Sequence, residues 1–254
     1  MKKLRTATRV LRTFGWKHTI LLTLKKINIH KDAEVVDLAR YINIKNEADL
    51  LSFLRNKLEI DDELIGRATK LISELDRNKT FSRSYRRTQF FDENYDLGKN
   101  TGFILTALIL KLNPRLVLET GVAAGLSSSY VLKALSSLPK KGRLVSVDIT
   151  ESCGELIPSE LKEFWNLEIL KGRKQLAFET VVKQLEWCDV FIHDSDHSSK
   201  WQNFEIATVL QYFPDLRILI VDDPTAELLN NEIENFERVV IGEENKIAAI
   251  FVRK

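Results

Sequence analysis

Acidic side chains and one histidine stand at the ends of four apolar runs in the second half of the chain. Residues of these types can accept hydrogen bonds from hydroxyl groups, hold cations and move protons. They are Glu119, Asp148, Asp194, His197, Asp222 and Asp223. Parallel strands bring their carboxyl ends to one edge of a sheet, where open α/β sheets bind ligands. We therefore expect these side chains to surround one site.

The segment of residues 119–128, ETGVAAGLSS, joins the first apolar run to a predicted helix. Gly121 and Gly125 allow a tight turn and a close approach of the backbone to a ligand. Free N–H groups at the start of the helix would face the site. Glu119 could accept a hydrogen bond from the ammonium group of an amino-acid-like ligand, or it could organise the loop.

Asp148 ends the second run, where a carboxylate can accept both hydroxyls of a ribose. The spacing G-x-G-x-x-G, which NAD-binding proteins need, is absent from residues 119–128. The alternative to a nucleoside site is an ordinary strand-to-helix turn at Gly121 and Gly125. The combination of this turn with Asp148 favours the nucleoside site.

The E-x-G-x-x-x-G-x-S turn and the acid at the second strand's end together resemble class I S-adenosylmethionine-dependent methyltransferases. The segments DSDHS (residues 194–198) and DDP (residues 222–224) extend the resemblance. They are similar to the small-molecule O-methyltransferases, which include catechol, caffeoyl-CoA and macrolide-sugar enzymes, and to methyltransferase family 24 with its D-G-D-H-S segment. The resemblance covers roughly residues 100–254 and implies S-adenosylmethionine as cofactor.

The resemblance assigns cofactor contacts to the turn and to the ends of the neighbouring strands. The residues are Glu119, Gly121, Val122, Gly125, Ser127, Ser128, Asp148, Gln175 and Asp194. One position departs from the pattern, since related enzymes often place an acid for the adenine amino group after the third strand. Here Gly172 is followed by Arg173, Lys174 and Gln175, so adenine recognition would fall to the backbone or to Gln175.

In metal-dependent relatives, acids after the fourth and fifth strands hold Mg²⁺, which implies Asp194, Asp222 and Asp223 as ligands here. Three converging carboxylates repel one another unless a cation or protons neutralise them, and oxygen ligands suit Mg²⁺. The alternative is that these acids cap loops and a helix.

His197 is the candidate general base, with Asp194 as the second catalytic candidate. His197 could equally fix its own loop. Within the same region, we expect His193 to lie in the core of a strand, and Trp201 either to wall the substrate pocket or to pack.

The elements that carry these residues alternate between apolar strands and amphipathic helices from about residue 101 onward. Strands are expected at residues 115–120, 143–148, 167–170, 189–193, 217–221, 238–241 and 247–252. Helices are expected at residues 101–112, 125–138, 175–185 and 200–212. The pattern predicts a Rossmann-like, doubly wound α/β fold with a mostly parallel seven-stranded sheet. The last two strands, joined by a short turn, form an antiparallel hairpin.

The first part of the chain differs, and we predict two units: a helical segment over residues 1–98 and the cofactor-binding domain over residues 99–254. Leucines and isoleucines recur at three- and four-residue intervals in residues 50–58 and 64–75, the period of a buried helical face. Residues 78–99 are polar with several aromatics and are expected to form a loop against the main domain. The helical segment would serve as a cap, a substrate-binding segment or an oligomerisation segment.

Residues 1–31 contain nine Lys or Arg and no Asp or Glu. Arg5, Arg9 and Arg12 recur at helical spacing, which is typical of a segment lying on an anionic membrane surface. Contact with RNA phosphates and an organellar transit peptide are alternatives. The favoured interpretation is a solvated helix that docks on the catalytic domain or on a second subunit, which makes a homo-oligomer one of the expected assemblies.

Composition excludes several classes of protein. Hydrophobic residues make up 44% of the chain and charged residues 29%, which is typical of a folded protein with a core. Cys153, Cys188 and four histidines have no zinc-ligand spacing and predict no disulfide framework. With no apolar run of membrane-spanning length and no secretion signal, we expect a cytoplasmic protein, peripheral at the membrane if residues 1–31 bind it.

The leading hypothesis is therefore O-methylation of a small-molecule hydroxyl, assisted by a divalent metal. One alternative is an RNA or protein methyltransferase. It would require Arg5, Arg9, Arg12 and Arg173 to form one basic surface leading to the site. Another alternative is a non-catalytic, membrane-associated protein on the same fold, because a fold alone does not establish activity.

Overall fold

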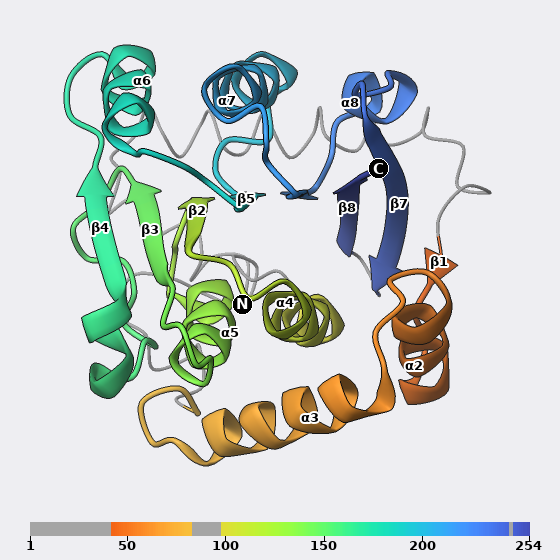
Figure 1. Cartoon of the computed structure of the whole chain (residues 1–254). Helices are drawn as coiled ribbons and strands as arrows, with labels where there is room; N and C mark the ends of the chain where they lie inside the picture. The colour runs from red at the N-terminus through yellow and green to blue at the C-terminus, as the bar shows by residue number, and fades with distance from the viewer. Residues whose placement is uncertain (1–41, 83–97, 244–245) are drawn as a thin grey trace, which may run out of the picture.

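The computed structural model describes residues 42–82, 98–243 and 246–254, and in this part of the chain all the strands form one sheet (Figure 1). The strands are β1 (Ile42–Asn43), β2 (Leu116–Thr120), β3 (Arg143–Asp148), β4 (Trp165–Ile169), β5 (Val190–His193), β6 (Ile218–Asp222), β7 (Phe236–Glu243) and β8 (Lys246–Arg253). They lie in the order β1-β7-β8-β6-β5-β2-β3-β4. Only β8 runs antiparallel to its neighbours, β6 and β7.

This arrangement confirms the Rossmann-like α/β fold and the antiparallel C-terminal hairpin, but the sheet has eight strands where seven were predicted. The additional strand is β1, which pairs in parallel with the outer side of β7 through Ile42 and Asn43. A strand of two residues has no alternating pattern, so the sequence gives no signal for it.

Helices cover both faces of the sheet (Figure 1). On one face lie α6 (Lys174–Gln184), α7 (Ser199–Tyr212) and α8 (Ala226–Asn230), and on the other lie α4 (Lys99–Leu112) and α5 (Leu126–Ser136). Strand residues alternate between two cores: Val117 packs on the α4–α5 side, whereas Leu118 packs on the α6–α7 side. Consecutive side chains at the end of a strand therefore point to opposite faces of the sheet.

Two N-terminal helices form a further layer outside α4 and α5. They are α2 (Glu47–Asn56) and α3 (Asp62–Arg77), each begun by a side-chain cap, from Asn46 and from Asp61. The buried face of α3 contains Ile65, Ala68 and Ile72, and it joins the core on the α4–α5 side. The described part of the N-terminal segment therefore shares one core with the sheet.

Several predictions concern residues outside the described part of the chain. These are the basic segment 1–31 with Arg5, Arg9 and Arg12, and most of the aromatic loop 78–99. Among the residues that are described, every helix is too short or too polar to cross a bilayer.

Candidate functional site

The turn between β2 and α5 lies between the ends of β3 and β5. Gly121 has φ of +81°, and its N–H donates to the carbonyl of Val147 at 2.9 Å. A Cβ on Gly121 would lie 1.9 Å from the carbonyl oxygen of Asp194, so this position requires glycine. Gly125 also has a positive φ, of +89°, and begins α5. The turn is thus held tightly at the point where strand order reverses, between β2 and β5.

Asp148 lies directly against this turn. One carboxylate oxygen accepts the N–H of Val122 at 2.9 Å, and the other accepts those of Ile149 and Thr150 at 2.6 and 2.9 Å. The side chain is partly exposed, and an ionised carboxylate has about four acceptor positions, so about one remains for a ligand hydroxyl. The two places predicted to bind a nucleoside and its amino-acid tail are therefore in direct contact.

Glu119 lies beneath the turn and is fully buried. It accepts hydrogen bonds from the hydroxyls of Ser127, Ser128 and Ser146 at 2.7, 2.6 and 2.6 Å. Burial raises the pKa of Glu119, although the serine hydroxyls oppose that shift. Of the two roles considered for this residue, the geometry favours organising the loop. The first N–H groups of α5, including those of Ser127 and Ser128, have no acceptor within the helix itself.

A second group of side chains gathers beyond β5 and β6. It consists of Asp194, His197 and Asp222, whose candidate ligand atoms all lie within 4.8 Å of one another. His197 donates from Nδ1 to the backbone carbonyl of Asp222 at 3.1 Å, and its Nε2 lies 3.9 Å from a carboxylate oxygen of Asp194. Asp223 is exposed, has φ of +44° and lies outside this group. Of the three acids assigned to a metal ion, Asp194 and Asp222 therefore belong to this group and Asp223 does not, whereas His197, the candidate general base, does.

The electrostatics of this group follow from burial and crowding. Burial raises the pKa of Asp194 well above its ordinary range, and the neighbouring carboxylates of Asp222 and Glu119 raise it further. Burial lowers the pKa of His197, so its imidazole is held neutral with a lone pair on Nε2. Such a group can share a proton, accept one, or coordinate a cation.

Sequence reasoning missed one buried carboxylate altogether. Glu205 of α7 is only 1% exposed and accepts hydrogen bonds from Thr120, His193, Ser195 and Trp201. His193 is confirmed as a buried strand residue, and the indole N–H of Trp201 is directed into this network. The available signal was a single acid at an otherwise buried position of a helix, four residues after a tryptophan.

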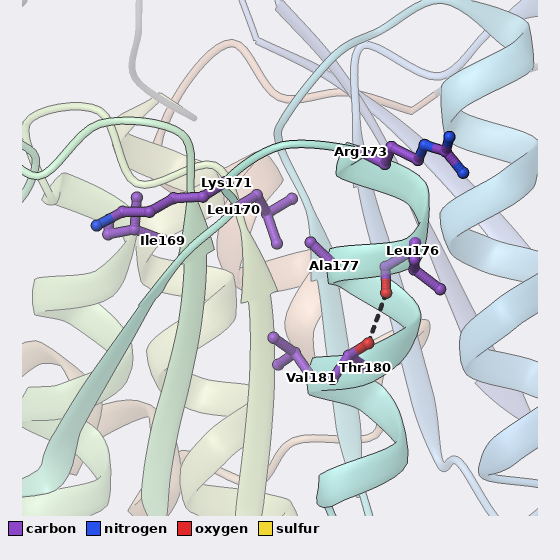
Figure 2. A pocket seen from close by; sticks show the side chains of 8 residues that line it. All are labelled: Ile169, Leu170, Lys171, Arg173, Leu176, Ala177, Thr180 and Val181. Carbon is purple, nitrogen blue, oxygen red and sulfur yellow. Dashed lines mark hydrogen bonds between the residues drawn. The ribbon is translucent and has the colours of Figure 1, made fainter.

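The segment after β4 borders an open hollow of about 440 Å³ between the strand end and α6 (Figure 2). Leu170, Ala177 and Val181 line it, while Lys171 and Arg173 extend to opposite sides. The hollow lies beside the predicted nucleoside site, because the N–H of Leu170 donates to the backbone carbonyl of Asp148. Gln175 is exposed and is not among the residues that line it.

Two exposed apolar side chains near this place were also missed. Ile149 is 44% exposed and Leu176 is 57% exposed, and they follow the ends of β3 and β4, which are neighbouring strands. A ring system bound beyond Asp148 would cover such side chains.

Comparison with known proteins agrees with the fold. Residues 118–224 match a family model described as a methyltransferase domain, which spans β2 to the end of β6 and so includes both groups of side chains. No curated protein matches the chain by sequence.

Solved structures with a similar fold include several methyltransferases. The S-adenosylhomocysteine-bound methyltransferase of Podospora anserina has 13% identity and a TM-score of 0.51, over 74% of this chain and 96% of that one. An O-methyltransferase from Bacillus cereus, in complex with S-adenosylhomocysteine, has 15% identity and a TM-score of 0.49, over 80% and 96% of the two chains. An O-methyltransferase of tomaymycin synthesis from Streptomyces achromogenes, in complex with S-adenosylmethionine, has 18% identity and a TM-score of 0.48, over 80% and 95%.

Proposed function

We propose that this chain, whose residues 118–224 match a methyltransferase-domain model, is a class I S-adenosylmethionine-dependent methyltransferase that transfers the cofactor's methyl group to a hydroxyl oxygen of a small molecule. The observation that carries the proposal is the hydrogen bond between Val122 and Asp148, because it joins the glycine turn to the strand-end acid. In this fold these are the two places where a ligand with a ribose and an amino-acid tail would be bound.

The proposed cofactor pose uses groups that are still available. The ribose would bind at Asp148, and the methionine carboxylate at the first N–H groups of α5, where the helix dipole favours an anion. The adenine would contact Ile149 and Leu176, which are otherwise exposed. In this pose Glu119, Ser127 and Ser128 shape the turn from below through their side chains.

We propose the group formed by Asp194, His197 and Asp222 as the place where the acceptor oxygen is bound and loses its proton. The carboxylates of Asp194 and Asp222, whose candidate ligand atoms lie within 4.8 Å of each other, suit a divalent cation such as Mg²⁺ or Mn²⁺, and this arrangement leaves Nε2 of His197 for proton transfer. A cation would relieve the crowding that raises the pKa of Asp194. When bound, it would lower the pKa of the acceptor hydroxyl and orient that hydroxyl.

The side chains of this group have separate tasks in the proposed reaction. The lone pair on Nε2 of His197 can take the acceptor's proton, since its Nδ1 is occupied by the carbonyl of Asp222. Asp194 and Asp222 hold the acceptor, directly or through the cation. The methyl group of a sulfonium is already activated, so this chain's main contributions are alignment of the two reactants and deprotonation.

Calorimetry with S-adenosylhomocysteine tests the cofactor part of the proposal. We expect saturable, stoichiometric binding, and its absence at concentrations well above the micromolar range would overturn the proposal. A radiolabelled-methyl assay over phenols, sugars, RNA and protein then tests the acceptor class. Transfer to RNA or protein alone would overturn the small-molecule part. Activity that survives EDTA and the Asp222→Ala substitution would remove the metal part.

A further inference from the structure

Glu205 connects four different parts of the molecule through one buried carboxylate. One oxygen accepts from Thr120 Oγ1 at 2.8 Å, His193 Nδ1 at 2.6 Å and Ser195 Oγ at 2.9 Å. The other oxygen accepts the indole N–H of Trp201 at 2.7 Å. The four donors come from the end of β2, the end of β5, the following loop and α7. A carboxylate that is only 1% exposed needs such donors, because burying a carboxylate without hydrogen-bond partners costs roughly several kcal/mol of folding free energy.

The loop that Glu205 holds is the one that carries Asp194 and His197. Its backbone is attached at Asp194, whose N–H donates to the carbonyl of Thr120 at 2.8 Å. Its side-chain attachment is Ser195, which bonds Glu205 and also receives the N–H of Trp201 at 3.2 Å. The loop is therefore fixed at Ser195, which lies between Asp194 and His197 in the sequence.

A second buried carboxylate, that of Glu119, holds a different connection in place on the other face of the sheet. Glu119 holds the β2–α5 turn through Ser127 and Ser128, on the side of α5. Thr120 and His193, adjacent in register across β2 and β5, direct their side chains to Glu205 on the side of α7. The turn that would bind the cofactor and the loop that would bind the acceptor are thus supported by separate networks.

We infer that Glu205 is a positioning residue for the acceptor side of the site, which it serves by fixing residues 194–198 through Ser195. In this role it keeps Asp194 and His197 at ligand distance from Asp222 without touching substrate or cofactor. The inference rests on the proposed function for its link to catalysis, but the fixing of the loop by Glu205 can be measured without any substrate.

The test uses the full chain and four variants, two of them at Ser195. Ser195→Ala removes the loop's bond to Glu205, whereas Ser195→Thr keeps a hydroxyl at the same place. Glu205→Gln weakens all four contacts at once, because an amide oxygen accepts from fewer donors and its NH₂ group faces other donors. Ser127→Ala is the matched control, since it removes one hydroxyl from the Glu119 network instead.

Amide hydrogen exchange of residues 194–198 and of residues 121–128 is measured for each variant, together with the affinity for S-adenosylhomocysteine. We expect Ser195→Ala and Glu205→Gln to speed exchange at residues 194–198 about tenfold, in line with the loss of one or more hydrogen bonds. Ser195→Thr restores slow exchange. Residues 121–128 and the cofactor affinity stay within about twofold of the wild type in these variants, whereas Ser127→Ala shows the reverse selectivity.

Slow exchange at residues 194–198 in Ser195→Ala would overturn the inference, and so would equal acceleration in both segments. If Glu205→Gln fails to fold, the Ser195 pair decides alone. Failure of the wild type to bind S-adenosylhomocysteine would overturn the proposed function instead, while the exchange measurements would still decide whether Glu205 fixes the loop.

Discussion

Asp148, Glu119 and Glu205 each accept several hydrogen bonds, but from different donors. The partners of Asp148 are backbone N–H groups, and its side chain is partly exposed. The partners of Glu119 and Glu205 are side-chain donors, and both carboxyls are buried. Both oxygens of Glu119 and both oxygens of Glu205 already accept hydrogen bonds from side chains, so we assign ligand binding to Asp148 and structural support to the other two.

The Asp148→Ala substitution is expected to abolish measurable binding of S-adenosylhomocysteine. It removes the acceptor proposed for the ribose and also releases the N–H of Val122, so each loss of about 1–3 kcal/mol reduces affinity, together by at least about 30-fold. Isothermal titration calorimetry measures this directly. Glu168→Ala, an exposed acid on the neighbouring strand β4, is the control and should bind normally. Near-normal binding by Asp148→Ala would mean that the nucleoside lies elsewhere.

The Asp194→Asn substitution is expected to raise thermal stability near neutral pH in the absence of divalent cations. Burial and Asp222 raise the pKa of Asp194 above its ordinary value of 3.8, so the folded protein binds more protons than the unfolded chain. Its contribution to stability is therefore present at low pH and falls as pH rises through the raised pKa. Asparagine removes this loss, and each kcal/mol recovered raises Tm by about 2–4 °C.

Thermal melts from about pH 4 to pH 8 check this expectation. The advantage of Asp194→Asn should shrink toward the acid end, where Asp194 is protonated in the wild type. Added Mg²⁺ should raise the melting temperature of the wild type and leave the variant unchanged. Asp215→Asn, at an exposed position between α7 and β6, controls for loss of one negative charge. A constant difference between wild type and Asp194→Asn at every pH would contradict the raised pKa.

At the scale of elements, the β2–α5 turn leaves no room for a side chain at Gly121. The Gly121→Ala substitution combines a positive φ with a Cβ 1.9 Å from a backbone oxygen, which must shift to make room. We expect a loss of at least about 3 kcal/mol in the free energy of unfolding, measured by urea denaturation. Gly66→Ala in α3 is the opposite control, because nothing lies within 4 Å of its Cβ position. Gly66→Ala should increase the free energy of unfolding by about 0.5–1 kcal/mol. Similar losses of stability for both substitutions would contradict this account of the turn.

The central strands could be predicted from the sequence because their burial on both faces leaves continuous apolar runs. Leu116–Thr120 and Ile218–Asp222 are buried at every position, and their ends located the site. Element ends were less certain: β4 begins two residues before its predicted start and is exposed at alternate positions, as an edge strand can be.

The sequence could not predict which acid joins Asp194 and His197, because this depends on where β6 ends. Consecutive residues of a strand point to opposite faces, so either Asp222 or Asp223 could have faced Asp194. In the structure Asp222 ends the strand, and Asp223 adopts a positive φ and is exposed. Glu205 was missed for a related reason: its role depends on donors from β2 and β5, which are remote in sequence.

At the scale of the whole molecule, the two groups of side chains lie on different strands of the sheet. Strands β2, β3 and β4 carry the turn, Asp148 and the hollow beside α6, whereas β5 and β6 carry the group of Asp194, His197 and Asp222. Helices α2 and α3 pack outside α4 and α5, where they extend the core on that side of the sheet (Figure 1). The reactants would therefore meet above the boundary between β2 and β5, where Gly121 approaches Asp194.

Charge is also distributed unevenly over the molecule. Residues 1–31 carry nine basic and no acidic side chains, so the remaining residues carry 29 Lys and Arg against 36 Asp and Glu. Such a segment is attracted to anionic lipid, at about 1 kcal/mol for each basic residue near the surface. Binding to an anionic membrane surface is therefore the alternative interpretation of residues 1–31 that can be tested directly against a docked helix.

Neutralising Arg5, Arg9 and Arg12 together as Gln in the full chain should weaken co-sedimentation with phosphatidylserine-containing vesicles by about 100-fold, since three residues contribute about 3 kcal/mol. Binding by the wild type should also fall steeply with added salt and be absent with phosphatidylcholine alone.

The matched control neutralises three exposed lysines elsewhere, Lys57, Lys79 and Lys140, at the same net charge. Equal loss of binding in both triple variants would show that net charge, rather than this segment, drives the association. Binding to single-stranded RNA in preference to vesicles would assign the segment to nucleic acid instead. The affinity for S-adenosylhomocysteine should be the same in all three proteins, because the proposed cofactor site uses none of these side chains.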